Sequence, residues 1–166
     1  MNKKDYTVFG FIVMLGVLLG YLWLAPSGQP PAPQASFKDL QGKNFSLEQL
    51  RGKPVIVNFW ATTCPGCVLE IPALIALSEK YATQNLVVIG VAMDYDPESQ
   101  VREMVRQKNM TYPVVLDAQG DLAKAFGNVS LIPTTFFINK EGKIYKHKLG
   151  EMTHTELETT IQSLIL

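Results

Sequence analysis

Two cysteines separated by two residues are the part of this sequence with the clearest capacity for chemistry. They stand in a Cys-Pro-Gly-Cys motif at 64–67, and the chain has no other cysteine. Cysteines at this spacing can close a small disulfide without large strain, and a thiolate is the nucleophile of thiol–disulfide exchange. If Cys64 opens a helix, the unpaired backbone N–H groups and the helix dipole favour its thiolate. Cys67, one turn further in, is expected to be more buried and to resolve a mixed disulfide.

Two other roles for this cysteine pair are weaker. A passive disulfide in an oxidising compartment gains little stability, because so short a loop removes little chain entropy. Half of a tetrahedral zinc site would need further ligands, but the chain has no second CxxC and only two histidines. Exchange is therefore favoured, and no bound metal or other cofactor is expected.

The elements around the motif are expected to alternate between strands and helices. Short, almost wholly apolar runs are typical of strands buried on both faces, and Thr153 with Glu156 forms a capping box before a last amphipathic helix. The predicted strands are 55–60, 86–93, 114–116, 134–138 and 143–149, the helices 64–81, 97–108 and 122–126, and a small hairpin covers 36–47. The pattern is that of an α/β domain.

The composition narrows the classes of protein to which the chain can belong. It has 166 residues, 47% hydrophobic and 18% charged, with 15 basic and 15 acidic side chains. Zero net charge argues against nucleic-acid binding, which needs a clustered basic face, and the apolar content argues against disorder. The length allows one domain, or one domain with an appendage.

The appendage is an apolar N-terminal run that predicts a membrane anchor. No charged residue occurs between Asp5 and Lys38, and residues 6–25 can cross a bilayer as one helix at about 1.5 Å rise per residue. The two lysines within residues 1–5 keep that end in the cytoplasm by the positive-inside rule. A cleaved signal peptide is the alternative, because residues 25–27 offer a small-x-small cleavage site.

A linker rich in proline is expected between this anchor and the domain. Residues 26–35 carry four prolines, which favour an extended, semi-rigid spacer. The spacer would hold the domain, predicted at 36–166, a few tens of Å from the bilayer on its extracytoplasmic side.

Two stretches of the chain resemble the TlpA/ResA-like thioredoxins, which are membrane-anchored thiol–disulfide oxidoreductases. The first is VNFWATTCPGC at 57–67 with Glu-Ile-Pro at 70–72, and the second is IPTTFFIN at 132–139 with Glu-Gly at 141–142. The segment 95–117 is similar to the αβ insertion that separates this family from plain thioredoxin. The resemblance implies an α/β, thioredoxin-like fold with an N-terminal hairpin and a central αβ insertion, preceded by one transmembrane helix.

The resemblance implies chemical roles for three residues. Cys64 becomes the attacking thiol and Cys67 the resolving thiol of a redox-active disulfide. Glu70 matches a carboxylate beneath the active site that shuttles the proton of Cys67, and burial would raise its pKa toward the useful range. Plain thioredoxin carries a buried aspartate where Asn58 stands, so Glu70 is the candidate base. The alternative for Glu70 is a solvated glutamate on a helix face.

The resemblance also implies a partner-binding surface. Pro133 matches the cis-proline that faces the disulfide, and the alternative is an ordinary trans proline in a turn. Its neighbours Ile132 and Thr134 would hold a partner strand by backbone pairing. Trp60 and Pro65 are expected to complete the surface.

Two positions depart from the family pattern. Thr63 replaces the tryptophan that commonly precedes the first cysteine, and Leu131 stands where a glycine is usual. Both changes alter the surface that faces a partner, so the identity of the partner does not transfer from any one family member.

The function implied is exchange of dithiols and disulfides with protein partners on the outer, periplasmic face of a bacterial cytoplasmic membrane. The family's commonest task is reductive, often on the haem-attachment cysteines of apocytochrome c, with electrons from a membrane thiol-transfer protein. Donation of disulfides is the alternative direction. A copper chaperone is the alternative from another class, but copper carriers of this fold space their cysteines by three residues. His147 and His154 are expected at the surface.

Overall fold

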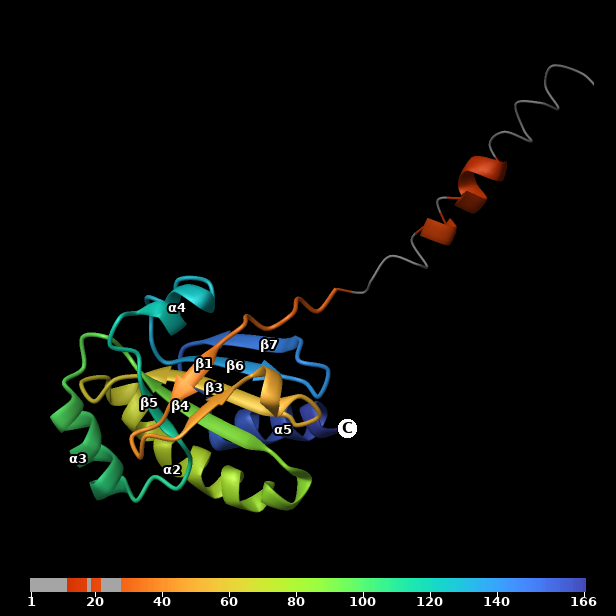
Figure 1. Cartoon of the computed structure of the whole chain (residues 1–166). Helices are drawn as coiled ribbons and strands as arrows, with labels where there is room; N and C mark the ends of the chain where they lie inside the picture. Colours follow the sequence, from red (N-terminus) through yellow and green to blue (C-terminus); the bar gives the residue numbers. More distant parts are fainter. Residues whose placement is uncertain (1–11, 18, 22–27) are drawn as a thin grey trace, which may run out of the picture.

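The computed structural model describes residues 12–17, 19–21 and 28–166 (Figure 1). Residues 12–17 and 19–21 are helical. Within the described ranges, no helix has both the length and the apolar character needed to cross a membrane. The anchor predicted at 6–25 falls partly outside these ranges, and the cytoplasmic segment predicted at 1–5 falls wholly outside them.

A five-stranded mixed sheet forms the centre of the domain, in the order β5-β4-β3-β6-β7. The strands are β3 (Val55–Trp60), β4 (Val87–Ala92), β5 (Val114–Leu116), β6 (Thr134–Ile138) and β7 (Ile144–Leu149). β3 pairs in parallel with β4 and antiparallel with β6, so it is the central strand. All five strands match predicted ones to within one residue at each end.

The central strand β3 is buried on both faces, as its apolar run predicts. All six of its residues are buried, and successive side chains point to opposite faces of the sheet. Ile56 and Trp60 belong to one cluster of the core, whereas Val55, Val57 and Phe59 belong to the other. The sheet therefore separates two apolar layers. The Cys-Pro-Gly-Cys motif follows the end of β3, between these two layers.

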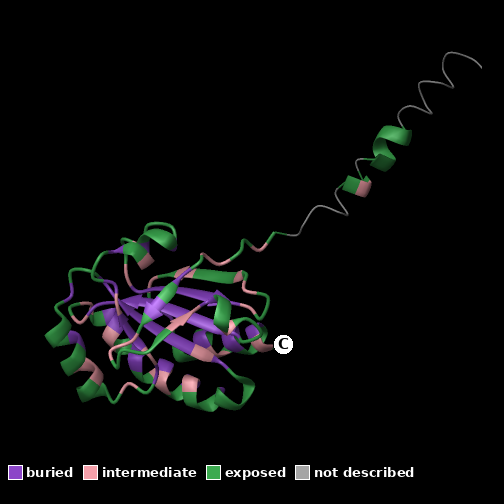
Figure 2. Ribbon diagram, in the orientation of Figure 1, coloured by how far each residue is buried: buried purple, intermediate pink, exposed green. Residues whose placement is uncertain are grey.

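Helices cover one face of the sheet, and a helix and a hairpin cover the other (Figures 1 and 2). The elements outside the central sheet are β1 (Ser36–Lys38), β2 (Asn44–Ser46), η1 (Glu48–Leu50), α2 (Pro65–Lys80), η2 (Ala82–Gln84), α3 (Glu98–Lys108), α4 (Asp121–Ala125) and α5 (His154–Ile165). On the first face α2 and α5 pack together, with α3 joining the same apolar cluster. On the second face lie the hairpin of β1 and β2, η1 and α4.

The predicted local signals appear in the structure. The hairpin at 36–47 forms β1 and β2, and the segment 95–117 supplies α3 and the edge strand β5. At the start of α5 the Thr153 side chain accepts a hydrogen bond from the Glu156 N–H, and the Glu156 carboxylate accepts one from the Thr153 N–H. The predicted capping box is therefore confirmed.

The structure corrects the extent of the linker predicted at 26–35. The Ile144 N–H donates to the Pro30 carbonyl at 2.8 Å, and the Ala32 N–H donates to the Gly142 carbonyl at 2.9 Å. These bonds fix the chain against the end of the β6–β7 hairpin, so residues from Pro30 onward are part of the folded domain rather than a free spacer.

Candidate active site

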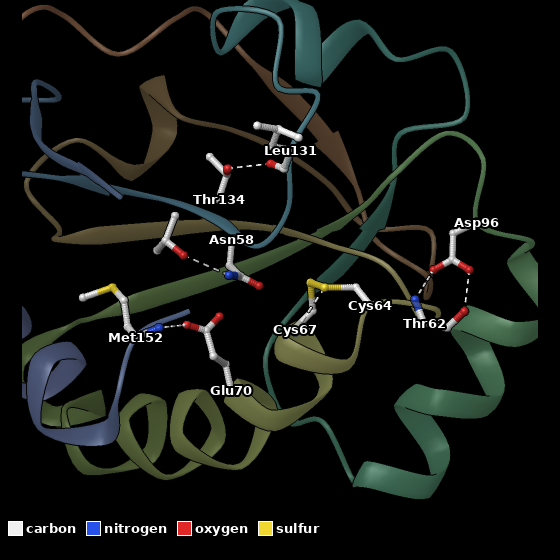
Figure 3. The surroundings of a disulfide bond; sticks show 10 residues. Asn58, Thr62, Cys64, Cys67, Glu70, Asp96, Leu131, Thr134 and Met152 are labelled. Atoms are coloured by element: carbon white, nitrogen blue, oxygen red, sulfur yellow. Dashed lines mark hydrogen bonds between the residues drawn. A yellow bond between two sulfur atoms is a disulfide. The ribbon is translucent and has the colours of Figure 1, made fainter. Parts of the chain in front are cut away.

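Cys64 and Cys67 form a disulfide at the N-terminus of α2 (Figure 3). Cys64 is the N-cap residue, and its sulfur accepts a hydrogen bond from the Cys67 N–H at 3.2 Å. Pro65 occupies the first helical position, where its fixed φ is suitable and its missing N–H costs nothing. Cys67 is only 2% exposed, whereas Cys64 is half-buried, so the two sulfurs differ in their access to solvent.

The loop between β3 and the disulfide is held by a buried carboxylate of the insertion. Asp96, which is 7% exposed, accepts the Thr62 N–H and the Thr62 hydroxyl, each at 2.6 Å (Figure 3). Because Thr62 lies two residues before Cys64, these bonds fix the position of the loop that leads to Cys64. Sequence reasoning missed Asp96, and no local pattern marks a contact across 34 positions.

Replacing Asp96 with alanine is expected to lower the free energy of unfolding by about 1–3 kcal/mol, since the partly buried Thr62 donors lose the carboxylate that accepts from them. Chemical denaturation of the oxidised protein measures this loss. Asp94→Ala removes an exposed carboxylate two residues away and serves as the matched control. Equal losses in the two variants would contradict an anchoring role for Asp96.

Glu70 is buried to one side of the disulfide, one turn after Cys67 on the same helix face (Figure 3). One carboxylate oxygen accepts the Met152 N–H, and the other, Oε2, has no hydrogen-bond partner among the described residues. Burial raises the pKa of Glu70 from 4.5 to about 7, and the nearby Glu151 carboxylate adds to the rise, while the Met152 bond opposes it. The alternative of a solvated helix-face glutamate is therefore wrong.

The proline before β6 has the predicted cis peptide bond, between Ile132 and Pro133. The Thr134 hydroxyl donates to the Leu131 carbonyl at 2.7 Å, and the Gly150 N–H donates to the Pro133 carbonyl at 2.8 Å. These bonds fix the loop from both sides. The alternative of a trans proline is wrong, whereas partner binding by Ile132 and Thr134 stays a prediction.

The structure corrects the prediction that Trp60 contacts a partner. Its side chain is 1% exposed, because the alternation along β3 turns it into the core on the α2 side. A Cβ added at Gly90 would lie 3.2 Å from the indole Nε1, so Trp60 fills the space over that glycine. Pro65 is exposed and stays available to a partner.

Asn58 forms a hydrogen bond across the sheet rather than an acid–base pair. Its amide donates to the Thr135 hydroxyl at 2.9 Å, joining β3 to β6 in the buried interior (Figure 3). Asn58 thus supplies no carboxyl on the α2 side of this strand, where Glu70 is buried.

The two histidines lie on β7 and α5, outside the disulfide motif. His147 is exposed on β7 and stacks on Phe136 with ring centroids 4.3 Å apart, and His154 on α5 lies 3.8 Å from Glu158. In the part of the chain that the structure describes, no three His, Cys, Asp or Glu side chains are grouped as metal ligands.

Comparison with known proteins finds relatives along most of the chain. The family model described as Redoxin matches residues 26–164. Thiol-disulfide oxidoreductase ResA of Geobacillus thermodenitrificans is 34% identical over an alignment 174 residues long, which covers 99% of this chain and 99% of that protein. A putative thioredoxin from Neisseria meningitidis is 37% identical with a TM-score of 0.74, covering 80% of this chain and 88% of that one. StoA from Bacillus subtilis is 28% identical with a TM-score of 0.67, covering 80% of this chain and 98% of that one.

Proposed function

The chain belongs to the Redoxin family, has a thioredoxin-like α/β fold and is a thiol–disulfide oxidoreductase of the ResA type, and on that premise we propose that it reduces disulfides of partner proteins outside the cytoplasm. Cys64 and Cys67 carry the two electrons. Glu70 accepts and returns the proton of Cys67, and the cis-proline loop binds the partner chain.

The unequal burial of the two cysteines supports Cys64 as the attacking thiol. In the reduced protein the Cys64 thiolate attacks a partner disulfide, forms a mixed disulfide and releases one partner sulfur as a thiolate. The Cys67 thiolate then attacks the Cys64 sulfur, which closes the internal disulfide and releases the second partner thiolate. Two electrons pass to the partner, and the half-buried Cys64 is the sulfur that a partner can reach.

The position of Glu70 supports a role in the second step. Cys67 is almost fully buried, so water does not readily take its proton. Glu70 lies on the same face of α2 and has one oxygen free of hydrogen bonds within the described residues. A pKa of about 7 lets this carboxyl accept and return a proton near neutral pH.

A partner strand is proposed to lie along the cis-proline loop. Ile132 and Thr134 flank Pro133, and their backbone groups are the ones we assign to pairing with the partner. Leu131, 62% exposed, and Leu149, 53% exposed, offer apolar contacts beside the loop, since Leu149 is the cross-strand neighbour of Thr134. With Thr63 in place of a tryptophan, this surface is less aromatic than the family pattern.

We assign residues 6–25 to a single membrane-spanning anchor, with the catalytic domain on the extracytoplasmic side. The uncharged apolar run supports this assignment, and the Pro30 contacts imply that the domain begins about five residues beyond it. Electrons would come from a membrane thiol-transfer protein. Haem-attachment cysteines of apocytochrome c are the proposed partner, because the resemblance to the TlpA/ResA-like thioredoxins implies a reductive task that often acts on these cysteines.

The reduction potential of the full chain in detergent tests the proposed direction. Equilibration with thiol buffers, followed by trapping of free thiols, is expected to give about −270 mV or lower, the range of thioredoxin. A value near −120 mV, the range of a disulfide donor, would reverse the direction. No reversible two-electron couple at all would contradict the exchange function.

A further inference from the structure

The segment Gly150–Met152 joins the cis-proline loop to α2. The Gly150 N–H donates to the carbonyl of Pro133 at 2.8 Å, and the Met152 N–H donates to the Glu70 carboxylate. Glu151 lies between these two bonds, so its backbone is fixed by the cis-proline loop on one side and by α2 on the other. Its position next to the disulfide is therefore built into the fold.

The Glu151 side chain lies over the backbone between the two cysteines. A Cβ added at Gly66 would overlap the Glu151 carboxylate and would lie 2.6 Å from its Cγ. The carboxylate thus uses the room that the missing side chain of Gly66 leaves at the first turn of α2. This turn has no acidic residue of its own, so Glu151 supplies the negative charge that the helix N-terminus favours.

The charge of Glu151 is available to a partner. The side chain is exposed and forms no ion pair with any basic residue that the structure describes. Lys148 on β7 is the basic group of this region: its charge lowers the pKa of Glu70, whereas the charge of Glu151 raises it. Asp96, on the insertion, is buried and already holds Thr62.

We propose that Glu151 selects partner segments that carry a basic residue beside the reacting cysteine and disfavours acidic ones. This inference rests on the proposed exchange function. A partner strand that pairs with the cis-proline loop brings its cysteine to Cys64, and the loop is bonded to the residue before Glu151. A lysine or arginine flanking that cysteine then lies within reach of the carboxylate, and an aspartate or glutamate there meets like charge.

Two peptide disulfides test this selection. Each is a dimer of one short peptide, identical except that lysine or glutamate flanks the cysteine, and the pre-reduced full chain in detergent supplies the electrons. At low salt we expect the lysine peptide to be reduced about three- to tenfold faster, because the two peptides differ by one attraction and one repulsion at a surface site. The preference should shrink in about 0.5 M salt, because salt screens interactions between exposed charges.

Variants of Glu151 separate charge from shape. Glu151→Gln is expected to remove most of the preference, and Glu151→Lys is expected to invert it. Glu79→Gln removes an exposed carboxylate at the other end of α2 and should leave the preference unchanged. Equal rates on both peptides, or a preference unaffected by Glu151→Gln, would overturn the inference alone. A wild-type chain that reduces neither peptide contradicts the exchange function itself, and the inference falls with it.

Discussion

Replacing Cys64 with serine is expected to slow reduction of a protein disulfide by roughly a thousandfold or more, because a serine hydroxyl stays protonated where a thiolate forms. Cys64 is half-buried, and Cys67 is only 2% exposed. Without the Cys64 sulfur, a partner therefore has no accessible thiolate to react with. The rate of reduction of a fluorescent protein-disulfide substrate by the pre-reduced chain measures the effect. The folded structure should persist, and reduced wild type is the reference for its stability.

Cys67→Ser is the matched control for that experiment. This variant keeps the attacking thiol but cannot close the internal disulfide, so it should accumulate a covalent complex with one partner molecule per chain. Non-reducing electrophoresis detects the complex. If Cys64→Ser forms the complex and Cys67→Ser does not, the two roles are reversed.

Much of the fold follows from patterns that are local in the sequence. The apolar run of β3 and the Thr153–Glu156 capping box each involve residues within a few positions of one another, and the structure contains both. Pro65 at the first position of α2 is another local signal, because proline is favoured there for reasons internal to the helix. Such features need no knowledge of distant contacts.

The contacts that complete the active site join residues far apart in the chain. Asp96 is 34 positions from Thr62, and Met152 is 82 positions from Glu70. Neither contact leaves a local trace, because any carboxylate or backbone N–H has the same chemistry in isolation. The cysteine pair could therefore be predicted from its spacing and Glu70 from the family resemblance, whereas the contacts of Asp96 and Met152 could not.

The two corrected predictions have a related cause. Trp60 was assigned to a partner surface by resemblance, but the alternation along β3 places its side chain in the core. The prolines of 26–35 favour an extended backbone, and an extended backbone is also what pairs with the β6–β7 hairpin from Pro30 onward. The local sequence indicated an extended backbone in both cases and left open which surface the residue would contact.

Replacing Glu70 with glutamine is expected to make the stability of the oxidised protein less dependent on pH. Burial raises the folded-state pKa to about 7 from 4.5, so the folded state binds more protons than the unfolded state between these values. The free energy of unfolding therefore falls as pH rises through this range, by about 3 kcal/mol in total. Glu70→Gln removes the loss, so denaturant titrations should find the variant more stable than wild type at pH 8 and similar to it at pH 4.

The same substitution separates proton transfer from structural support. An amide can still accept the Met152 N–H but cannot take the proton of Cys67, so reduction of a partner should slow by about ten- to a hundredfold near neutral pH. The pH–rate profile should lose the inflection near 7 that this carboxyl contributes. Glu79→Gln, an exposed change on the same helix, should preserve both the rate and the profile. An unchanged profile in Glu70→Gln would show that the proton of Cys67 leaves by another route, and that Glu70 serves only to hold Met152.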